Sequence, residues 1–135
     1  MKFFPKEGGD FLIEMTKDEF FIIRGVLSHL TLKAVMGKDY DMFMSTGWNE
    51  TQILSLLTKI KESYQVENQS CMALLSEEEI IFLQKAIEDT TRFIGQEFSI
   101  LMGRTIEEAL VVKDNFSKRL KLAKCLLGNR RKGHG

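Results

Sequence analysis

Few side chains in this sequence are of the types that carry out chemistry in enzymes. The only histidines are His29 and His134, and the only cysteines are Cys71 and Cys125. A histidine base or metal ligand needs partner groups, which an unrelated part of the chain would have to supply. The two cysteines lack metal-ligand spacing and are too few for a disulfide framework. We interpret His29 as a structural residue of a helix and both cysteines as thiols in a reducing cytoplasm.

Two acidic pairs, Glu78–Glu79 and Glu107–Glu108, are the remaining candidates for acid–base chemistry. Paired carboxylates hydrolyse glycosidic bonds when they flank the substrate. Here each pair falls in the first turn of a predicted helix, where the helix dipole favours negative charge. The sequence contains no phosphate-binding glycine loop, nucleophile elbow or CxxC motif. We therefore expect that the protein is not an enzyme and has no catalytic residue, cofactor or metal.

Four capping boxes mark the starts of four predicted helices. In each box a short polar side chain precedes the helix, and a Glu or Gln three residues later reaches back to its amide. Two backbone N–H groups are satisfied at once in this way. The four pairs are Thr16 and Glu19, Asn49 and Gln52, Ser76 and Glu79, and Thr105 and Glu108. The boxes predict helices that begin at residues 17, 50, 77 and 106.

The four helices belong to two copies of one pattern. Residues 15–60 and 75–116 align at an offset of 60 residues in their first halves and of 56 residues in their second halves. The first offset pairs Phe20 with Ile80, Ile23 with Leu83, and Leu27 with Ile87. The second offset pairs Gly47 with Gly103, Asn49 with Thr105, and Leu54 with Leu110. The chain is therefore interpreted as an internal duplication that has lost about four residues between the helices of its second copy.

This duplication predicts a mainly α fold, a compact four-helix domain with pseudo-twofold symmetry built from two helix–connector–helix units. At 135 residues the chain is long enough to bury one core without disulfides. The expected organisation is one domain over 1–128, repeat one at 12–62, a polar linker at 63–70, repeat two at 71–127 and a disordered basic tail at 129–135. In repeat one, the second helix is expected to bury Ile53, Leu54, Leu56, Leu57 and Ile60.

Short apolar runs precede the first and third helices, at residues 11–15 and 71–75. Two interpretations fit them. Each run is a short strand, with the two strands paired to one another, or each is a hydrophobic staple that fixes the entry into its helix. We favour strands and expect at most this small two-stranded pairing.

Charge is balanced over the whole chain but divided between its parts. Lys plus Arg and Asp plus Glu both number 19. Residues 113–132 carry eight basic residues and one acidic residue, a net +7, which leaves −7 on residues 1–112. The N-terminal sequence does not read as a signal peptide, and no apolar run reaches the length of a membrane span. We expect a cytoplasmic protein that does not associate with membranes.

The connector between the first two helices contains more aromatic and Met side chains than a solvated loop needs. Tyr40 and Trp48 are the best candidates for exposed binding anchors, since only copy one has aromatic residues at these positions. The predicted partner-binding residues are Tyr40, Asp41, Phe43, Trp48 and Glu50. The −7 region would attract a basic partner.

One longer motif lies in the second copy. It begins with Ser76-Glu77-Glu78-Glu79 and continues as Glu97-Phe98-Ser99-Ile100-Leu101-Met102-Gly103-Arg104-Thr105-Ile106-Glu107-Glu108-Ala109. The pattern resembles a motif of small uncharacterised bacterial proteins, some of which resemble immunity proteins of polymorphic-toxin systems. It consists largely of caps and core positions, so no functional residue is carried over. What the resemblance implies is a non-enzymatic inhibitor that binds a toxin domain encoded nearby.

Two other functions remain open from the residues. The basic segment 113–132 would suit a nucleic-acid-associated regulator, although the helices that would read DNA begin with acidic residues that repel phosphate. Nucleic acid is therefore the less favoured partner. The excess of apolar side chains would also suit a self-associating adaptor, such as a homodimer.

Overall fold

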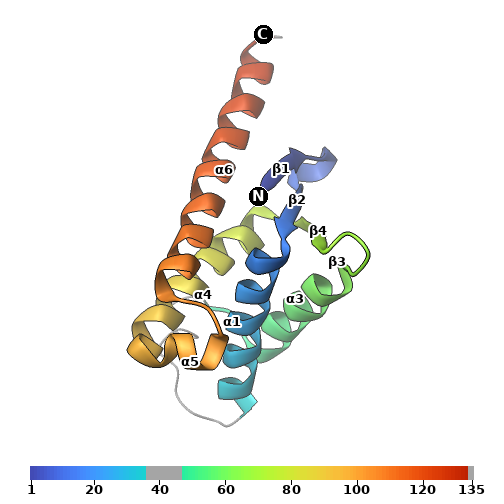
Figure 1. Ribbon diagram of the computed structural model, residues 1–135. Coiled ribbons are helices and arrows are strands. Elements are labelled where there is room, and N and C mark those ends of the chain that lie inside the picture. The colour runs from blue at the N-terminus through green and yellow to red at the C-terminus, as the bar shows by residue number, and fades with distance from the viewer. Residues whose placement is uncertain (36–46, 134–135) are drawn as a thin grey trace.

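The protein is a mixed α/β domain in which helices pack on one four-stranded antiparallel sheet (Figure 1). The computed structural model describes the backbone of residues 1–35 and 47–133, and the side chains of residues 1–31 and 47–126. The strands are β1 (Lys2–Pro5), β2 (Phe11–Thr16), β3 (Tyr64–Gln65) and β4 (Ser70–Leu75). The helices are α1 (Lys17–Val35), α3 (Glu50–Glu62), α4 (Glu77–Ile94), α5 (Phe98–Met102) and α6 (Ile106–Gly133), with 3-10 turns at Glu7–Gly9 and Gly95–Glu97. The expectation of a mainly α four-helix domain is therefore wrong.

The two central strands are the two apolar runs that precede α1 and α4. β2 pairs antiparallel with β4, so the interpretation of both runs as paired strands is confirmed. Side chains alternate between a buried and a more exposed face, and the buried face includes Phe11, Ile13 and Met15. Ile13 lies opposite Ala73, which is its own counterpart at the 60-residue offset. The pairing of the central strands is therefore symmetric about this one residue pair.

The two outer strands are the reason that the fold expectation failed. β1 lies in the N-terminal segment before residue 11, where no strand was predicted, and β3 lies in the expected linker 63–70. Each outer strand forms a hairpin with the central strand that follows it, giving the sheet order β1-β2-β4-β3. Strands of four and two residues are too short to show a periodic apolar pattern. Each repeat is therefore a hairpin followed by two helices.

Pro5 can sit in a strand because β1 is at the edge of the sheet. The Lys6 N–H donates to the Asp10 carbonyl at 2.8 Å, so Lys6 and Asp10 form a hydrogen-bonded pair. Hydrogen-bonded and non-hydrogen-bonded pairs alternate along an antiparallel ladder, and Pro5 lies opposite Phe11 at the next, non-bonded position. The missing N–H of Pro5 therefore points away from β2, where no ladder bond is lost.

All four predicted capping boxes are confirmed. In each box the N-cap backbone N–H donates to the Glu or Gln side-chain oxygen over 2.9–3.3 Å. The Glu or Gln backbone N–H donates back to the N-cap side chain over 2.9–3.2 Å. The helices begin where these boxes place them, at Lys17, Glu50, Glu77 and Ile106. The local sequence therefore determines all four helix starts.

The core lies between the buried face of the sheet and the apolar faces of the helices. The predicted stripe of α1 is fully buried, as are its counterparts on α4. These residues are Phe20, Ile23, Leu27 and Leu30 on α1, and Ile80, Leu83 and Ile87 on α4. In α3, Leu54 was expected in the core but is 47% exposed. Its neighbours Leu56 and Leu57 are buried, so α3 presents a narrower apolar face than expected.

Helix α6 is longer than the sequence suggested. Repeat two was expected to end at residue 127, but the backbone of α6 continues through Gly128 to Gly133. One glycine inside a helix costs only about 1 kcal/mol relative to alanine, which does not end a long helix. The C-terminal turns of α6 project beyond the sheet in Figure 1. Residues 129–133, which were assigned to a disordered tail, therefore continue the helix, and residues 134–135 lie outside the described part.

Candidate functional site

Of the five predicted partner-binding residues, the structure describes Trp48 and Glu50. Tyr40, Asp41 and Phe43 lie outside the described residues. Glu50 is exposed at the start of α3. Trp48 is half-buried, and its ring stacks on Phe82 with a centroid separation of 4.1 Å and an interplanar angle of 11°. The contact that is described for Trp48 is thus made inside the protein.

Trp48 and its counterpart Arg104 both connect one repeat to the other. Each lies immediately before the N-cap of the second helix in its repeat. Trp48 of repeat one stacks on Phe82 of α4, whereas Arg104 of repeat two donates to Asp18 of α1 at 2.8 Å. These contacts hold the two repeats against each other, so we assign Trp48 a structural role.

The histidine and cysteine side chains that the structure describes lie on three different elements, α1, β4 and α6. His29 is half-buried in α1, and His134 lies outside the described residues. Cys71 is fully buried in β4, where burial raises the pKa of its thiol to about 11, while Cys125 is exposed on α6. Among the described residues, no group of three His, Cys, Asp or Glu side chains is arranged to hold a metal ion.

One glutamate of each acidic pair that suggested paired-carboxylate chemistry closes a capping box, Glu79 that of α4 and Glu108 that of α6. Glu79 also accepts from Lys59 at 2.9 Å, which joins α3 to α4. Outside these pairs, Glu88 accepts from Lys113 of α6 at 3.1 Å. That lysine, by its hydrogen bond and its charge, lowers the pKa of the Glu88 carboxyl.

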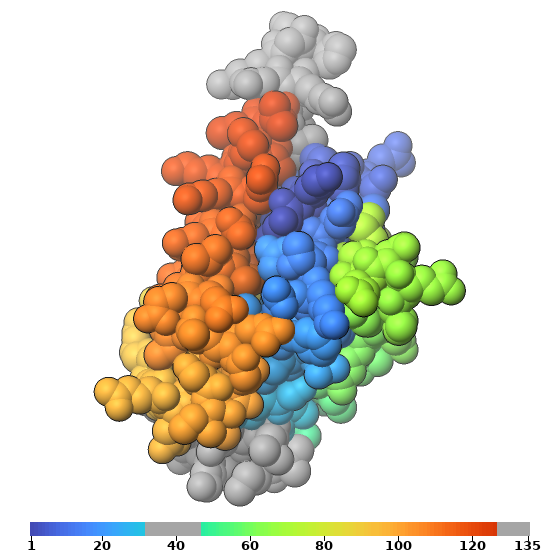
Figure 2. Space-filling view, viewed as in Figure 1, coloured from blue at the N-terminus to red at the C-terminus, as the bar shows by residue number. Residues whose placement is uncertain are grey.

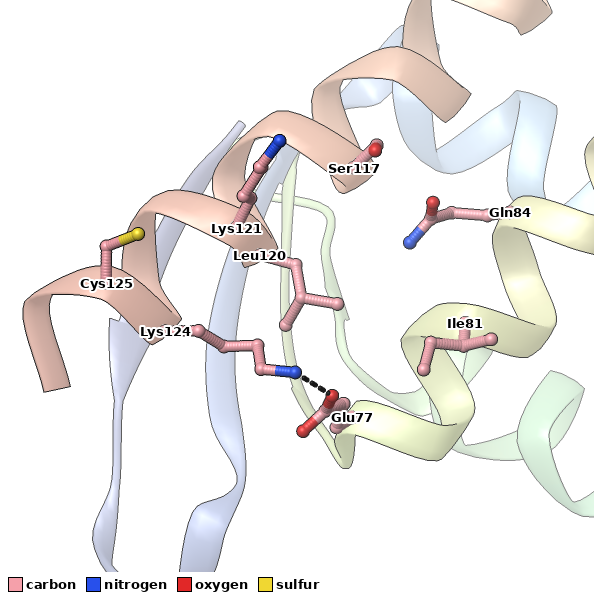
Figure 3. A pocket seen from close by; sticks show the side chains of 8 residues that line it. All are labelled: Glu77, Ile81, Gln84, Ser117, Leu120, Lys121, Lys124 and Cys125. Atoms are coloured by element: carbon pink, nitrogen blue, oxygen red, sulfur yellow. Dashed lines mark hydrogen bonds and ion pairs between the residues drawn. The ribbon is translucent and has the colours of Figure 1, made fainter. Parts of the chain in front are cut away.

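An open groove of about 460 Å³ lies between α4 and α6 (Figure 3). Its size falls within the range of ligand-binding clefts. We call it the α4–α6 groove, and its lining residues are Glu77, Ile81 and Gln84 of α4 and Ser117, Leu120, Lys121, Lys124 and Cys125 of α6. In Figure 3, Leu120 points from α6 into the space between the helices, and Ile81 faces it from α4.

Helical periodicity explains how the groove is built. On α4 the lining residues recur at intervals of four and three, and on α6 they recur at three, one, three and one, so each set forms one stripe. The next stripe of α6, which includes Leu122 and Leu126, faces β1 instead. α6 therefore contributes one face to the sheet side of the domain and another to the groove.

The floor of the groove is apolar and its rim is charged. Leu120 is 7% exposed and forms part of the floor, whereas Ile81 is 52% exposed and accessible to a partner. At the rim, the Lys124 Nζ donates to the Glu77 Oε1 at 2.6 Å. Lys121 has no ion-pair partner among the side chains that the structure describes. Such a site can bind an apolar side chain and place a positive charge beside it.

Other exposed apolar side chains are more scattered. Ile100 and Leu101 of α5 are 83% and 57% exposed. Val66, at the turn of the β3–β4 hairpin, is 77% exposed, and this hairpin projects from the side of the molecule in Figure 2. Single exposed apolar residues are normal on protein surfaces. Phe4, Leu122 and Leu126 line a smaller hollow of about 240 Å³ between β1 and α6, so the α4–α6 groove is one of several hollows lined by exposed apolar residues.

Comparison with known proteins gives no relative from which a site could be transferred. No protein-family model, curated protein or solved structure matches the chain. No helix within residues 1–35 and 47–133 is long and apolar enough to cross a membrane. The site is therefore argued from its own geometry.

The groove could not be predicted from the sequence, because no local pattern of residues encodes it. Ile81 is one of four consecutive apolar residues on α4 and resembles core residues in the sequence. The groove depends on the side of α4 that α6 leaves uncovered, which no periodicity reveals. One signal was available, since Ile81 corresponds to Phe21 in the first repeat and the two differ in size.

Proposed function

We propose that this protein is a non-enzymatic, protein-binding inhibitor of the immunity type, which binds and neutralises a bacterial toxin domain. The class of function comes from the resemblance of residues 76–109 to immunity-type proteins. The single structural observation that supports binding is the α4–α6 groove, with half-exposed Ile81 above the buried Leu120. Apolar side chains in a concave surface are common anchors for a partner protein. The inhibitor acts in the cytoplasm, before its toxin is released.

This proposal moves the expected interface away from the first connector. Trp48 is engaged with Phe82, so its replacement would disturb the fold as well as any interface. Ile81 is the better test residue, because it is half-exposed and its side chain lines the groove. The rim of the groove is also basic on the α6 side, whereas the −7 region had suggested a basic partner.

The test is co-purification of the protein with the product of the gene next to its own. We expect a stable complex in which the neighbour's toxic activity is lost. Replacing Ile81 by Gln removes an apolar contact without changing the charge, and should weaken the complex. Leu54→Gln is the matched control, because Leu54 is 47% exposed on α3 and lies outside the groove. If no neighbouring gene product binds, or if both variants bind like the wild type, the proposal is wrong.

Nucleic-acid binding by the basic segment 113–132 is the second candidate. Two of its lysines, Lys113 and Lys124, form ion pairs with Glu88 and Glu77 of α4, which reduces the positive charge that would face phosphate. Deleting α6 is not a usable test, since Phe116 is part of the core. The test is a gel shift at low salt with the protein and with Lys118→Gln and Arg119→Gln variants. A shift that these changes weaken would favour this function over inhibition.

A further inference from the structure

The helix α4 wall of the groove has a counterpart in the first repeat. The 60-residue offset relates Glu77, Ile81 and Gln84 to Lys17, Phe21 and Arg24 of α1. These positions are spaced by four and three residues, so each set lies on one side of its helix. The first repeat therefore shows which side chains of the protein itself pack beside the corresponding residues.

In the first repeat, an aromatic ring lies against part of this surface, while Phe21 and Arg24 also line an open hollow of about 400 Å³ beside α5. Tyr64 stacks on Phe20 with a centroid separation of 4.4 Å and an interplanar angle of 16°, and its ring lies 6.3 Å from that of Phe21. Two cations surround the cluster, with Arg24 Cζ at 4.8 Å and Lys17 Nζ at 5.9 Å from the centroid of the Phe21 ring. Aromatic rings and cations attract each other in this geometry. The surface is thus suited to an aromatic side chain.

In the second repeat the chain does not supply such a ring. α3 ends at Glu62, so the chain turns back and Tyr64 enters the hairpin that covers α1. α6 continues as a helix past the corresponding point, and the counterpart of Tyr64 at the 56-residue offset is Leu120. The aliphatic Leu120 forms the floor, and a space of about 460 Å³ remains above it (Figure 3). Leu120 thus takes the position of Tyr64, and because leucine is smaller than tyrosine the groove lies open above it.

The charges around the groove indicate which charged group should lie next to an aromatic ring that binds there. Lys121 and Lys124 contribute two positive charges to the lining, and Glu77 contributes one negative charge, a net +1. Glu77 pairs with Lys124, which leaves Lys121 as the cation that can meet a partner's carboxylate. Exposed Lys118, one turn away on α6, adds to the positive potential outside the groove.

We propose that the α4–α6 groove binds an aromatic side chain of the partner protein, presented on a segment that carries a carboxylate next to the ring. The ring packs between Ile81 and Leu120, as Tyr64 packs on Phe20 and Phe21 in the first repeat. The carboxylate pairs with Lys121. This inference rests on the proposed function, since it names the chemistry of the segment that the inhibitor binds.

The test uses a synthetic peptide, acetyl-Asp-Glu-Tyr-Asp-Glu-amide, and nuclear magnetic resonance of the full-length protein labelled with ¹⁵N. We expect the peptide to shift the amide signals of Ile81, Gln84 and Ser117, which line the groove. Replacing the peptide's Tyr by Ala should weaken binding about tenfold or more, because it removes the aromatic surface. Absence of shifts at groove residues at millimolar peptide, or equal binding of the Ala peptide, overturns the inference.

Matched variants assign the contacts. Ile81→Gln should weaken peptide binding about tenfold, and Lys121→Gln should weaken it about threefold, with the latter effect lost at high salt. Leu54→Gln and Lys61→Gln are the controls, since both side chains are exposed on α3 and neither lines the groove. If a control variant weakens peptide binding as much as the groove variant with which it is paired, the assignment of the contacts is wrong. Circular dichroism verifies that each variant is folded.

The two proposals fail in different ways. If the peptide binds in the groove but no neighbouring gene product does, the inhibitor function is wrong and the chemistry of the groove stands. If a neighbouring product binds and Ile81→Gln weakens that complex, while the peptide does not bind, the groove is the interface but its occupant is not an acidic aromatic segment. That second result overturns the inference and leaves the proposed function in place.

Discussion

Trp48 offers the sharpest test of how the two repeats are joined. It is the only tryptophan of the chain, and it lies immediately before the N-cap of α3. Its ring stacks on Phe82 of α4, so Trp48→Ala removes a contact between repeats. If Trp48 were an exposed binding anchor, the same change would reduce binding without affecting stability. The free energy of unfolding therefore distinguishes the two roles.

The expected loss of unfolding free energy in Trp48→Ala follows from the area that the Trp48 ring buries and from its stacking on Phe82. A buried aromatic side chain covers about 150–250 Å², and a half-buried Trp48 therefore covers about 100 Å². At about 25 cal/mol per Å², this area is worth about 2.5 kcal/mol. A stacked aromatic pair adds about 0.5–1.5 kcal/mol. We expect Trp48→Ala to lower the free energy of unfolding by about 3–4 kcal/mol, and Trp48→Phe to lower it by about 1 kcal/mol, because a smaller ring remains in place.

The assay is urea unfolding followed by circular dichroism, which reports on the variants that lack tryptophan. A double-mutant cycle with Phe82→Ala isolates the stack, and we expect a coupling of about 0.5–1.5 kcal/mol. In the wild type, Trp48 emission should shift to longer wavelength at the same urea concentration at which helix is lost. The reasoning is refuted if Trp48→Ala changes stability by less than about 0.5 kcal/mol, or if the cycle shows no coupling.

Three further changes test local parts of the structure. Ser76→Ala should lower the free energy of unfolding by about 1 kcal/mol through loss of the α4 cap, whereas Ser99→Ala at an exposed position should be neutral in the same urea assay. Gly103→Ala should cost about 1 kcal/mol, because Gly103 has a φ of 68° at the end of α5; an unchanged stability would contradict that conformation. In thiol titration, the native protein should expose Cys125 and protect Cys71, and denaturant should expose both. Burial raises the pKa of Cys71 from 9.0 to about 11, so the unfolded chain loses its proton first and stability should fall between pH 9 and 11. A Cys71→Ala variant should lose this part of the pH dependence.

The part of the fold that could be predicted is the part encoded by neighbouring residues. Thr16 with Glu19, and Ser76 with Glu79, lie within one helical turn of each other, so the caps are visible in the sequence. The apolar runs of β2 and β4 were also visible, and the duplication indicated that they pair. β3 has two residues and is defined only by its partner, Tyr64 opposite Cys71. Such a strand has no pattern of its own to detect.

Side-chain type does not specify exposure, and this limits how much of a candidate site can be predicted from the sequence. Trp48 lies in a connector, which suggested exposure, yet the position of α4 brings Phe82 against its ring. Ile81 lies in an apolar run, which suggested burial, yet its side chain is 52% exposed. In both cases a helix from a distant part of the sequence decides the environment. The relative positions of helices are a tertiary property that composition and spacing do not contain.

The duplication itself indicates where function is to be sought. Positions that perform the same structural task keep their chemistry in both repeats, as the caps of α1 and α4 do. Where the repeats differ, the residue in one copy no longer makes the structural contact of its counterpart, or it has a different role. Tyr64 and Leu120 form such a pair, since the Tyr64 ring packs on Phe20 of α1, whereas the smaller Leu120 lies at the floor of the groove beside α4. The difference between the two repeats thus directs attention to the α4–α6 groove without reference to any relative.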